Sequence, residues 1–218
     1  MPAGRQAARA ARDQFWRAQR MAARFRGPSI GRPLPSDLVT LREELRPTHA
    51  AYVSTVSTAE MAVSLETAAY LLWLCRTREP ASIADLGSGY SSFVLRQHAD
   101  HKGVRVVSAD GDQRWLEKSR RFIREQGLGD SDMVHWADLA GGKFDLVSHD
   151  LGSQEFRSQT AMQAFDLLAS GGVMVIDDVH NVELWGRGRR AAVSHGRRWA
   201  SLYRETLDHF GRFAALAY

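Results

Sequence analysis

Hydrophobic residues in the second half of the chain form five short runs that alternate with helix-like segments. Each run has the length and β-branched content of a buried strand, and the segments between the runs are long enough for crossover helices. The runs are Ser82–Leu86, Val104–Ser108, Asp132–Trp136, Phe144–Ser148 and Gly172–Ile176, and the clearest intervening helices are Gln113–Gln126 and Ser158–Leu168. This alternation predicts an α/β fold with a doubly wound parallel sheet.

The end of the chain has a different pattern. Ser201–Leu207 and Arg212–Tyr218 both resemble strands, and only four residues separate them. Because four residues are too few for a crossover helix, we expect the two segments to pair as an antiparallel hairpin. The complete prediction is a Rossmann-like seven-stranded sheet, with five parallel strands and a C-terminal antiparallel hairpin.

Two helical stretches precede the sheet. Residues 5–26 are rich in Ala, Gln and Arg, which predicts a solvated helix that ends at Gly27-Pro28. A second helix, with a dense apolar face, is expected over Thr58–Arg76. We therefore divide the chain into a basic helical extension and linker, residues 1–35, and a main α/β domain, residues 36–218.

The extension carries most of the positive charge. Residues 1–35 hold eight Arg and one Asp, a net charge of +7, whereas the whole chain has +4, so residues 36–218 carry −3. A broad basic track for nucleic acid is therefore not expected on the main domain. The single cysteine, Cys75, fits a reducing compartment, and no apolar run reaches the roughly 20 residues of a membrane span. We expect a cytoplasmic protein without a membrane span.

Acidic residues follow all five predicted strands, at the edge where open parallel sheets bind ligands. The first strand leads into Asp85-Leu86-Gly87-Ser88-Gly89-Tyr90. Its two glycines allow the backbone to turn sharply and to approach a ligand beside the positive N-terminus of the next helix. Asp110 follows the second strand, about 25 residues further on, the spacing at which an acid binds ribose hydroxyl groups. The other strands are followed by Asp138, Asp150 and the pair Asp177-Asp178.

Taken in order, these motifs resemble a class I S-adenosylmethionine-dependent methyltransferase. The resemblance covers residues 57–218 and rests on the strand–DLGSGYSS–helix unit, the acids after strands two and three, FDLVSHD and the terminal hairpin. It implies that S-adenosylmethionine is the cofactor. The implied cofactor-binding residues are Asp85, Gly87, Ser88, Gly89 and Tyr90 around the methionine part, Asp110 at the ribose and Asp138 at the adenine amino group. Trp115 either joins them or packs in the core.

Three carboxylates are expected to meet opposite the cofactor. Asp150, Asp177 and Asp178 end neighbouring strands, and such a set suits a hard cation such as Mg²⁺, which lowers the pKa of a hydroxyl acceptor. The pattern resembles metal-dependent O-methyltransferases of the catechol and macrolide-sugar types, as does the segment Val63–Thr67. We therefore interpret these acids as metal ligands, with Asp150 and His180 as catalytic residues and His180 as the general base. The alternative is that the acids contact cofactor or water, or cap the next segment.

The sequence thus predicts a magnesium-assisted O-methyltransferase for a small-molecule acceptor. The acceptor is expected to be anionic if the Arg-rich stretch 185–198 grips a carboxylate or phosphate over the cleft, the alternative being a solvated surface. A metal-independent methyltransferase for RNA or another acceptor, and an inactive cofactor-binding scaffold, stay open. A nicotinamide-linked oxidoreductase is disfavoured, because Ser92 stands where a dinucleotide fingerprint has its third glycine.

The basic extension is expected to pack on the main domain or on a second subunit of a homodimer. Arg-rich helices also bind acidic partners, RNA and membrane surfaces, and an Arg-rich, acid-poor start resembles an organellar transit peptide. These alternatives stay open.

Overall fold

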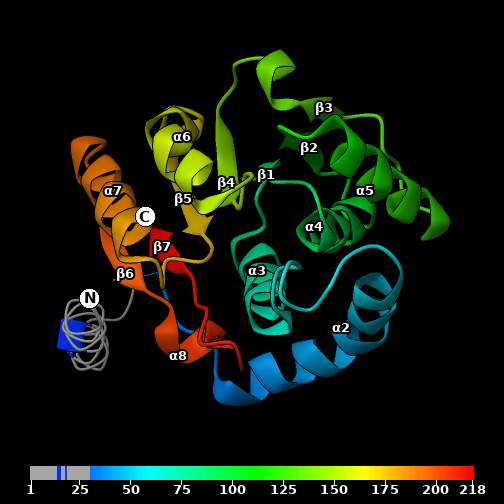
Figure 1. The fold of residues 1–218 in the computed structure, drawn as a ribbon, viewed down its shortest axis with the longest axis horizontal. Coiled ribbons are helices and arrows are strands. Elements are labelled where there is room, and N and C mark those ends of the chain that lie inside the picture. The colour runs from blue at the N-terminus through cyan, green and yellow to red at the C-terminus, as the bar shows by residue number, and fades with distance from the viewer. Residues whose placement is uncertain (1–13, 16–17, 19–29) are drawn as a thin grey trace, which may run out of the picture.

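A mixed seven-stranded sheet forms the centre of the protein (Figure 1). The computed structural model describes residues 14–15, 18 and 30–218. The strands are β1 Ser82–Leu86, β2 Arg105–Asp110, β3 Met133–His135, β4 Phe144–His149, β5 Leu168–Ile176, β6 Trp199–Ser201 and β7 Ala215–Ala217. Their order is β3-β2-β1-β4-β5-β7-β6, with β1 to β5 parallel and β7 antiparallel to both β5 and β6. The predicted doubly wound, Rossmann-like sheet is confirmed.

Helices cover both faces of this sheet. They are α2 Pro35–Thr55, α3 Leu65–Arg78, α4 Tyr90–Asp100, α5 Gln113–Glu125, α6 Gln154–Asp166, α7 Val182–Ser194 and α8 Tyr203–Thr206, with a short 3₁₀ helix, η1, at Trp136–Asp138. Helices α2 to α5 share one apolar core, and α6 and α7 share the other. Along β5 the side chains alternate between the cores, since Val173 and Val175 face the first, and Met174 and Ile176 the second.

The winding of the sheet reverses between β1 and β4, and this is where α/β folds bind ligands. Beyond β1 the chain turns at Gly87, which has φ +103°. A Cβ atom there would lie 2.3 Å from the carbonyl oxygen of Asp150, so the turn requires glycine. This close approach joins the loop after β1 to the loop after β4.

The C-terminal strands pair as predicted but have other bounds. β6 and β7 are antiparallel, with Ser201 opposite Ala215. The expected strand over Ser201–Leu207 and its four-residue turn are wrong, because Tyr203–Thr206 forms α8. The Thr206 hydroxyl group donates to the carbonyl group of Leu202, 2.9 Å away, and accepts from the amide of Ala214 at 2.9 Å. A helical turn satisfies these buried groups, which the alternating sequence pattern does not reveal.

The helices before the sheet also differ from the prediction. Helix α2 was not foreseen, and it contains Pro47 within its span. The expected helix over Thr58–Arg76 starts at Leu65, where the Ser64 side chain accepts from the amide of Thr67. Most of the expected helix 5–26 lies outside the described residues; Gln14, Phe15 and Ala18 are helical. None of the helices in the described part of the chain has the length and apolar character needed to cross a bilayer.

Candidate active site

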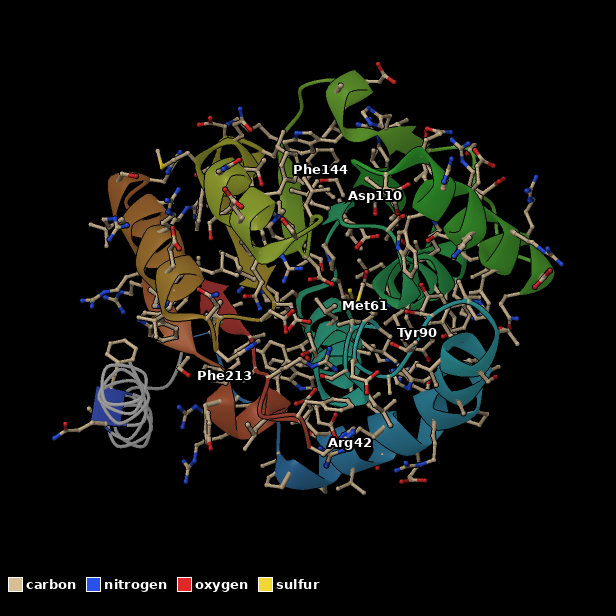
Figure 2. The ribbon with its side chains drawn as sticks, in the orientation of Figure 1. Arg42, Met61, Tyr90, Asp110, Phe144 and Phe213 are labelled. Atoms are coloured by element: carbon tan, nitrogen blue, oxygen red, sulfur yellow. The ribbon has the colours of Figure 1, made fainter. Side chains whose placement is uncertain are left out.

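A cavity of about 490 Å³ lies at the carboxyl ends of the strands. Residues 60–63, from the loop between α2 and α3, form part of its wall, and Figure 2 labels three of the lining residues, Met61, Tyr90 and Asp110. Nine of the residues predicted from the sequence line it: Gly87, Ser88, Gly89, Tyr90, Asp110, Asp150, Asp177, Asp178 and His180. The structure therefore brings most of the predicted site together, although these residues span more than 90 positions of the chain.

Asp85 supports the glycine loop, residues 87–89, through a chain of hydrogen bonds. Its side chain is fully buried and does not line the cavity. It accepts a 2.5 Å hydrogen bond from the Ser92 hydroxyl group, which itself accepts from the amide of Gly89 at 3.1 Å. Burial raises the pKa of Asp85 to about 6, although the hydrogen bond from Ser92 opposes the rise. Asp85 thus orders the loop and does not face the cavity as the resemblance implied.

Asp110 connects the end of β2 to the glycine loop through hydrogen bonds. One of its oxygens accepts from the Ser88 amide at 2.7 Å and from the Ser88 hydroxyl group at 3.0 Å, and the other accepts from the Asp112 amide at 2.9 Å. Trp115 lines the cavity and donates its indole N–H to the carbonyl oxygen of Ser88 at 2.5 Å. Because each carboxylate oxygen has two lone pairs and one of these oxygens accepts a single bond, Asp110 can accept a further hydrogen bond.

Tyr90 and Asp138 sit differently from what was expected. The Tyr90 ring lines the cavity, but its hydroxyl group lies 2.7 Å from Thr48 Oγ1 and 2.9 Å from the carbonyl oxygen of Leu45, both on α2. Asp138 lies on η1, is exposed, and is not among the lining residues. β3 ends at His135, and the 3₁₀ turn that follows carries Asp138 out of the cavity. Its predicted contact with adenine therefore has no support from its position.

Tyr52 on α2 also reaches the cavity and was not foreseen. Its side chain is fully buried, and its hydroxyl group has no partner of normal hydrogen-bond geometry in the described part of the chain. That hydroxyl group lies 3.3 Å from the position that a Cβ atom on Gly89 would take. Burial raises the pKa of Tyr52, so this group stays protonated and can donate. No motif marks it, because α2 precedes the glycine loop by more than 30 residues.

Arg212 fastens the loop between α2 and α3 against the cavity. Its guanidinium group donates to the carbonyl oxygens of Ala59, Glu60 and Ala62, at 3.1, 2.5 and 3.2 Å. An ion pair of 2.7 Å with the nearly buried side chain of Asp208 holds the guanidinium group in place. This contact spans about 150 residues of sequence and has no local signature.

A second arginine, Arg157 on α6, lies among the predicted metal ligands. Its side chain is 6% exposed. One terminal nitrogen lies 2.5 Å from Asp150 Oδ1, and the other lies 3.3 Å from Asp178 Oδ2. Burial raises the pKa of Asp150, and the charge of Arg157 opposes that rise. Asp177 faces another partner, since Thr67 Oγ1 donates to it at 3.3 Å.

The three acids therefore do not fit a magnesium site. In the described part of the chain, no three His, Cys, Asp or Glu side chains converge so that they could hold a metal ion. A divalent ion between Asp150 and Asp178 would have to displace a buried guanidinium group that already neutralises them. The prediction of metal ligands is corrected on this ground. Arg157 was not predicted from the sequence, because it lies inside a helix, seven residues after Asp150, and no motif marks it.

Asp178 also faces His180. Asp178 has φ +59°, a backbone conformation that is uncommon for residues other than glycine. Its Oδ1 atom lies 3.6 Å from His180 Nδ1, and neither atom has a hydrogen-bond partner in the described part of the chain. Burial lowers the pKa of His180, and the charge of Asp178 opposes this effect. A small approach of the two groups would form a carboxylate–imidazole pair with a neutral ring at the cavity wall.

The Arg-rich stretch 185–198 does not reach the cavity. Most of it forms α7, on which Arg187 pairs with Glu183 at 2.7 Å. Arg197 donates to the carbonyl oxygens of Ala169 and Gly172. None of these arginines lines the cavity, so their position gives no support to the prediction that they bind the acceptor. In the part of the chain that the structure describes, the arginines that line it are Arg157 and Arg212.

Comparison with known proteins identifies the fold. No family model and no curated protein sequence matches this chain. Among solved structures, cofactor-bound Rv0187 from MTB matches with a TM-score of 0.62 and 22% identity, covering 86% of this chain and 98% of that one. An O-methyltransferase from Bacillus cereus in complex with SAH matches with a TM-score of 0.58 and 18% identity, covering 85% and 90%. TomG, an O-methyltransferase from Streptomyces achromogenes involved in tomaymycin synthesis, in complex with SAM, gives 0.57 and 19%, covering 85% and 89%. The chain therefore has the Rossmann-like fold of class I methyltransferases.

Proposed function

We propose that this protein is a methyltransferase that binds S-adenosylmethionine and methylates an oxygen atom of a small-molecule acceptor. The observation that carries the proposal is the glycine loop at the switch point of the sheet. Its tight turn at Gly87, its bonds to Asp110 and the N-terminus of α4 all lie at one cavity. Three of the solved structures with a similar fold are complexes with a cofactor, two of them with SAH or SAM.

In this proposal the glycine loop and the end of β2 hold the cofactor. The backbone at Gly87 and Gly89 leaves room for close approach, and the N-terminus of α4 attracts the cofactor's carboxylate. Asp110 accepts from the ribose hydroxyl groups, and the Tyr52 hydroxyl group, close to Gly89, donates to the cofactor. Asp85 orders the loop through Ser92 without touching the ligand.

The bound cofactor supplies a methyl group on a positively charged sulfur, which a nucleophilic oxygen can displace in line. The protein's part is to position the acceptor and to remove its proton. His180 lines the cavity with a lowered pKa, so its ring is neutral and able to accept that proton near neutral pH. Asp178 stabilises the imidazolium ion that results and orients the ring. The acceptor proton thus passes to the ring nitrogen that does not face Asp178.

The charge of the cavity limits the acceptor. Among the residues that the structure describes, six acidic ones line it, namely Glu60, Asp110, Asp112, Asp150, Asp177 and Asp178, against two arginines. Such a wall attracts a sulfonium cofactor and repels carboxylates and phosphates. We therefore assign a neutral or cationic small molecule as the acceptor, in place of the anionic one, and RNA becomes a poor candidate. The homodimer and the role of the basic extension stay predictions, as does a cytoplasmic location, with which the buried free thiol of Cys75 is consistent.

The test is release of S-adenosylhomocysteine from S-adenosylmethionine, measured with matched sets of three acceptors that differ only in charge. Each set offers the same phenol or sugar hydroxyl group with a neutral, an ammonium or a carboxylate substituent. We expect turnover with the neutral or ammonium member and little with the carboxylate. Turnover of amines but of no hydroxyl compound would refute O-methylation, and absence of turnover with cofactor bound would favour the scaffold alternative.

A further inference from the structure

Arg157 takes the position that a divalent cation would need between the acidic residues of the cavity. It lies in the first turns of α6, shortly after the loop that follows β4. Its two terminal nitrogens lie 2.5 Å from Asp150 Oδ1 and 3.3 Å from Asp178 Oδ2. The guanidinium group therefore bridges the ends of β4 and β5, which are neighbouring strands of the sheet.

The same group also binds the backbone of both loops. It donates to the carbonyl oxygens of Asp150 at 3.3 Å and Gly152 at 3.1 Å, after β4, and to that of Asp177 at 3.4 Å, after β5. A planar guanidinium group with several fixed N–H donors can serve oxygens in these directions at once. These contacts hold the loop in which Asp178 takes its positive φ angle.

A divalent ion cannot share this position. Mg²⁺ requires oxygen ligands at about 2.0–2.1 Å in near-octahedral geometry. Asp150 Oδ1 is already ion-paired with Arg157, and Asp178 Oδ2 already accepts a hydrogen bond from it. The third acid, Asp177, accepts from Thr67, whose hydroxyl group is in turn bonded by Ser64 at 3.1 Å. An added double charge beside a buried guanidinium group would also meet strong repulsion in a medium of low polarity.

We infer that Arg157 is a built-in cation that replaces a metal ion: it closes the acid cluster to divalent cations and positions Asp178 toward His180. Arg157 is thus a positioning residue, since it acts through Asp178. One part of this inference is that methyl transfer needs no metal ion, and this part rests on the proposed function. The part that concerns cation binding does not depend on any activity.

The first experiment titrates the full-length protein with Mn²⁺ and follows free Mn²⁺ by electron paramagnetic resonance. We expect no binding to this cluster up to a concentration on the order of 1 mM, the weak end of protein sites for divalent ions. Binding in the unaltered protein that Asp178→Asn removes would overturn the inference. The titration needs neither cofactor nor acceptor, so its outcome does not depend on whether the proposed function is correct.

The second experiment removes the cation. Arg157→Gln leaves Asp150 and Asp178 without their counter-charge, so we expect the variant to gain Mn²⁺ binding and to melt at a higher temperature when Mn²⁺ is added. Arg157→Lys keeps the charge and serves as the matched control, with no gain of binding. If Arg157→Gln is folded and binds no Mn²⁺, Arg157 is not what closes the site. If it does not fold, the titrations of the unaltered protein and of Arg157→Lys decide, and Mn²⁺ bound by either at this cluster contradicts the inference.

A kinetic comparison tests the positioning role. In Arg157→Lys we expect kcat to fall, with the KM for S-adenosylmethionine nearly unchanged, and EDTA to leave the unaltered protein's turnover intact. Loss of turnover in EDTA, restored by Mg²⁺, would overturn metal independence.

Discussion

The two halves of the cavity are built in different ways. One half, which we assign to the cofactor, is the glycine loop after β1. This loop is held by hydrogen bonds to residues close by, as when the amide and hydroxyl groups of Ser88 both donate to Asp110. The opposite half consists of charged side chains whose partners come from distant elements, such as Arg157 on α6 and Thr67 on α3. A local motif is therefore enough to identify the first half, whereas the second depends on tertiary structure.

Loss of the proposed general base, His180, should produce the largest effect and affect only the half of the cavity that faces the glycine loop. For His180→Gln we expect kcat to fall by about 10²–10⁴-fold, the usual contribution of general base catalysis, with the affinity for S-adenosylhomocysteine unchanged. The pH profile of the unaltered protein adds a second check. Because burial lowers the pKa of His180 and the neutral ring is the active form, kcat/KM should be constant near neutral pH and fall only at a pH below the range in which an ordinary histidine titrates. An unchanged kcat in the variant would remove His180 from the mechanism.

Gly87→Ala should disrupt the contact between the two halves. The added methyl group would meet the carbonyl oxygen of Asp150 at 2.3 Å, on a residue with φ +103°. We expect a loss of about 2–4 kcal/mol in the free energy of unfolding, measured in urea, and loss of cofactor binding. Gly103→Ala is the matched control, because Gly103 also has positive φ, of +65°, but no atom within 4 Å of the added Cβ. Equal losses in the two variants would show that the close approach is unimportant.

Asp110→Asn should affect the cofactor half alone. Asparagine retains one acceptor oxygen for the Ser88 amide but removes the charge and one acceptor, so we expect cofactor affinity to weaken by about 1–3 kcal/mol. The comparison is calorimetric titration of S-adenosylhomocysteine into both proteins. Unaltered affinity would exclude Asp110 as the ribose ligand.

Asp85 offers a test that uses stability. Burial raises the pKa of Asp85 from its ordinary value of 3.8 to about 6, so the folded state binds the proton more tightly than the unfolded state. Stability from this group is complete at low pH and is lost as the pH rises from about 4 to 6. Asp85→Asn lacks this loss and should therefore gain about 1–3 kcal/mol relative to the unaltered protein between pH 4 and pH 7.5. The measurement is urea unfolding of both proteins at the two pH values, and a constant difference between them would contradict the raised pKa.

Arg187→Gln should have the smallest effect. Arg187 is exposed on α7 and pairs with Glu183 within the same helix, so we expect a change in stability of about 0.5 kcal/mol or less. Turnover of any acceptor should be unchanged. A marked rise in the KM for the acceptor would show that the Arg-rich stretch contributes to acceptor binding.

The sequence predicts the part of the molecule whose causes are local. The strands β1 to β5, the glycine loop and the acid Asp110 follow from apolar runs and from the residues that end them. Asp138 lies outside the cavity because β3 is short and a 3₁₀ turn follows it. Arg157 and Tyr52 were missed because each lies in a helix with no motif of its own. The sequence also predicts that Asp150, Asp177 and Asp178 gather in one cavity, as they do. It suggests a metal ion as their counter-charge, because the guanidinium group of Arg157, which pairs with Asp150 and Asp178, is brought there only by the fold.

The most direct test of the account is calorimetric titration of S-adenosylhomocysteine into the full-length protein in EDTA, repeated with Asp110→Asn and with NAD(P) as a competitor. The account predicts binding to the unaltered protein without added metal, weaker binding to the variant and no competition by NAD(P). Absence of binding, or displacement of the ligand by NAD(P), would contradict the assignment of this cavity to S-adenosylmethionine.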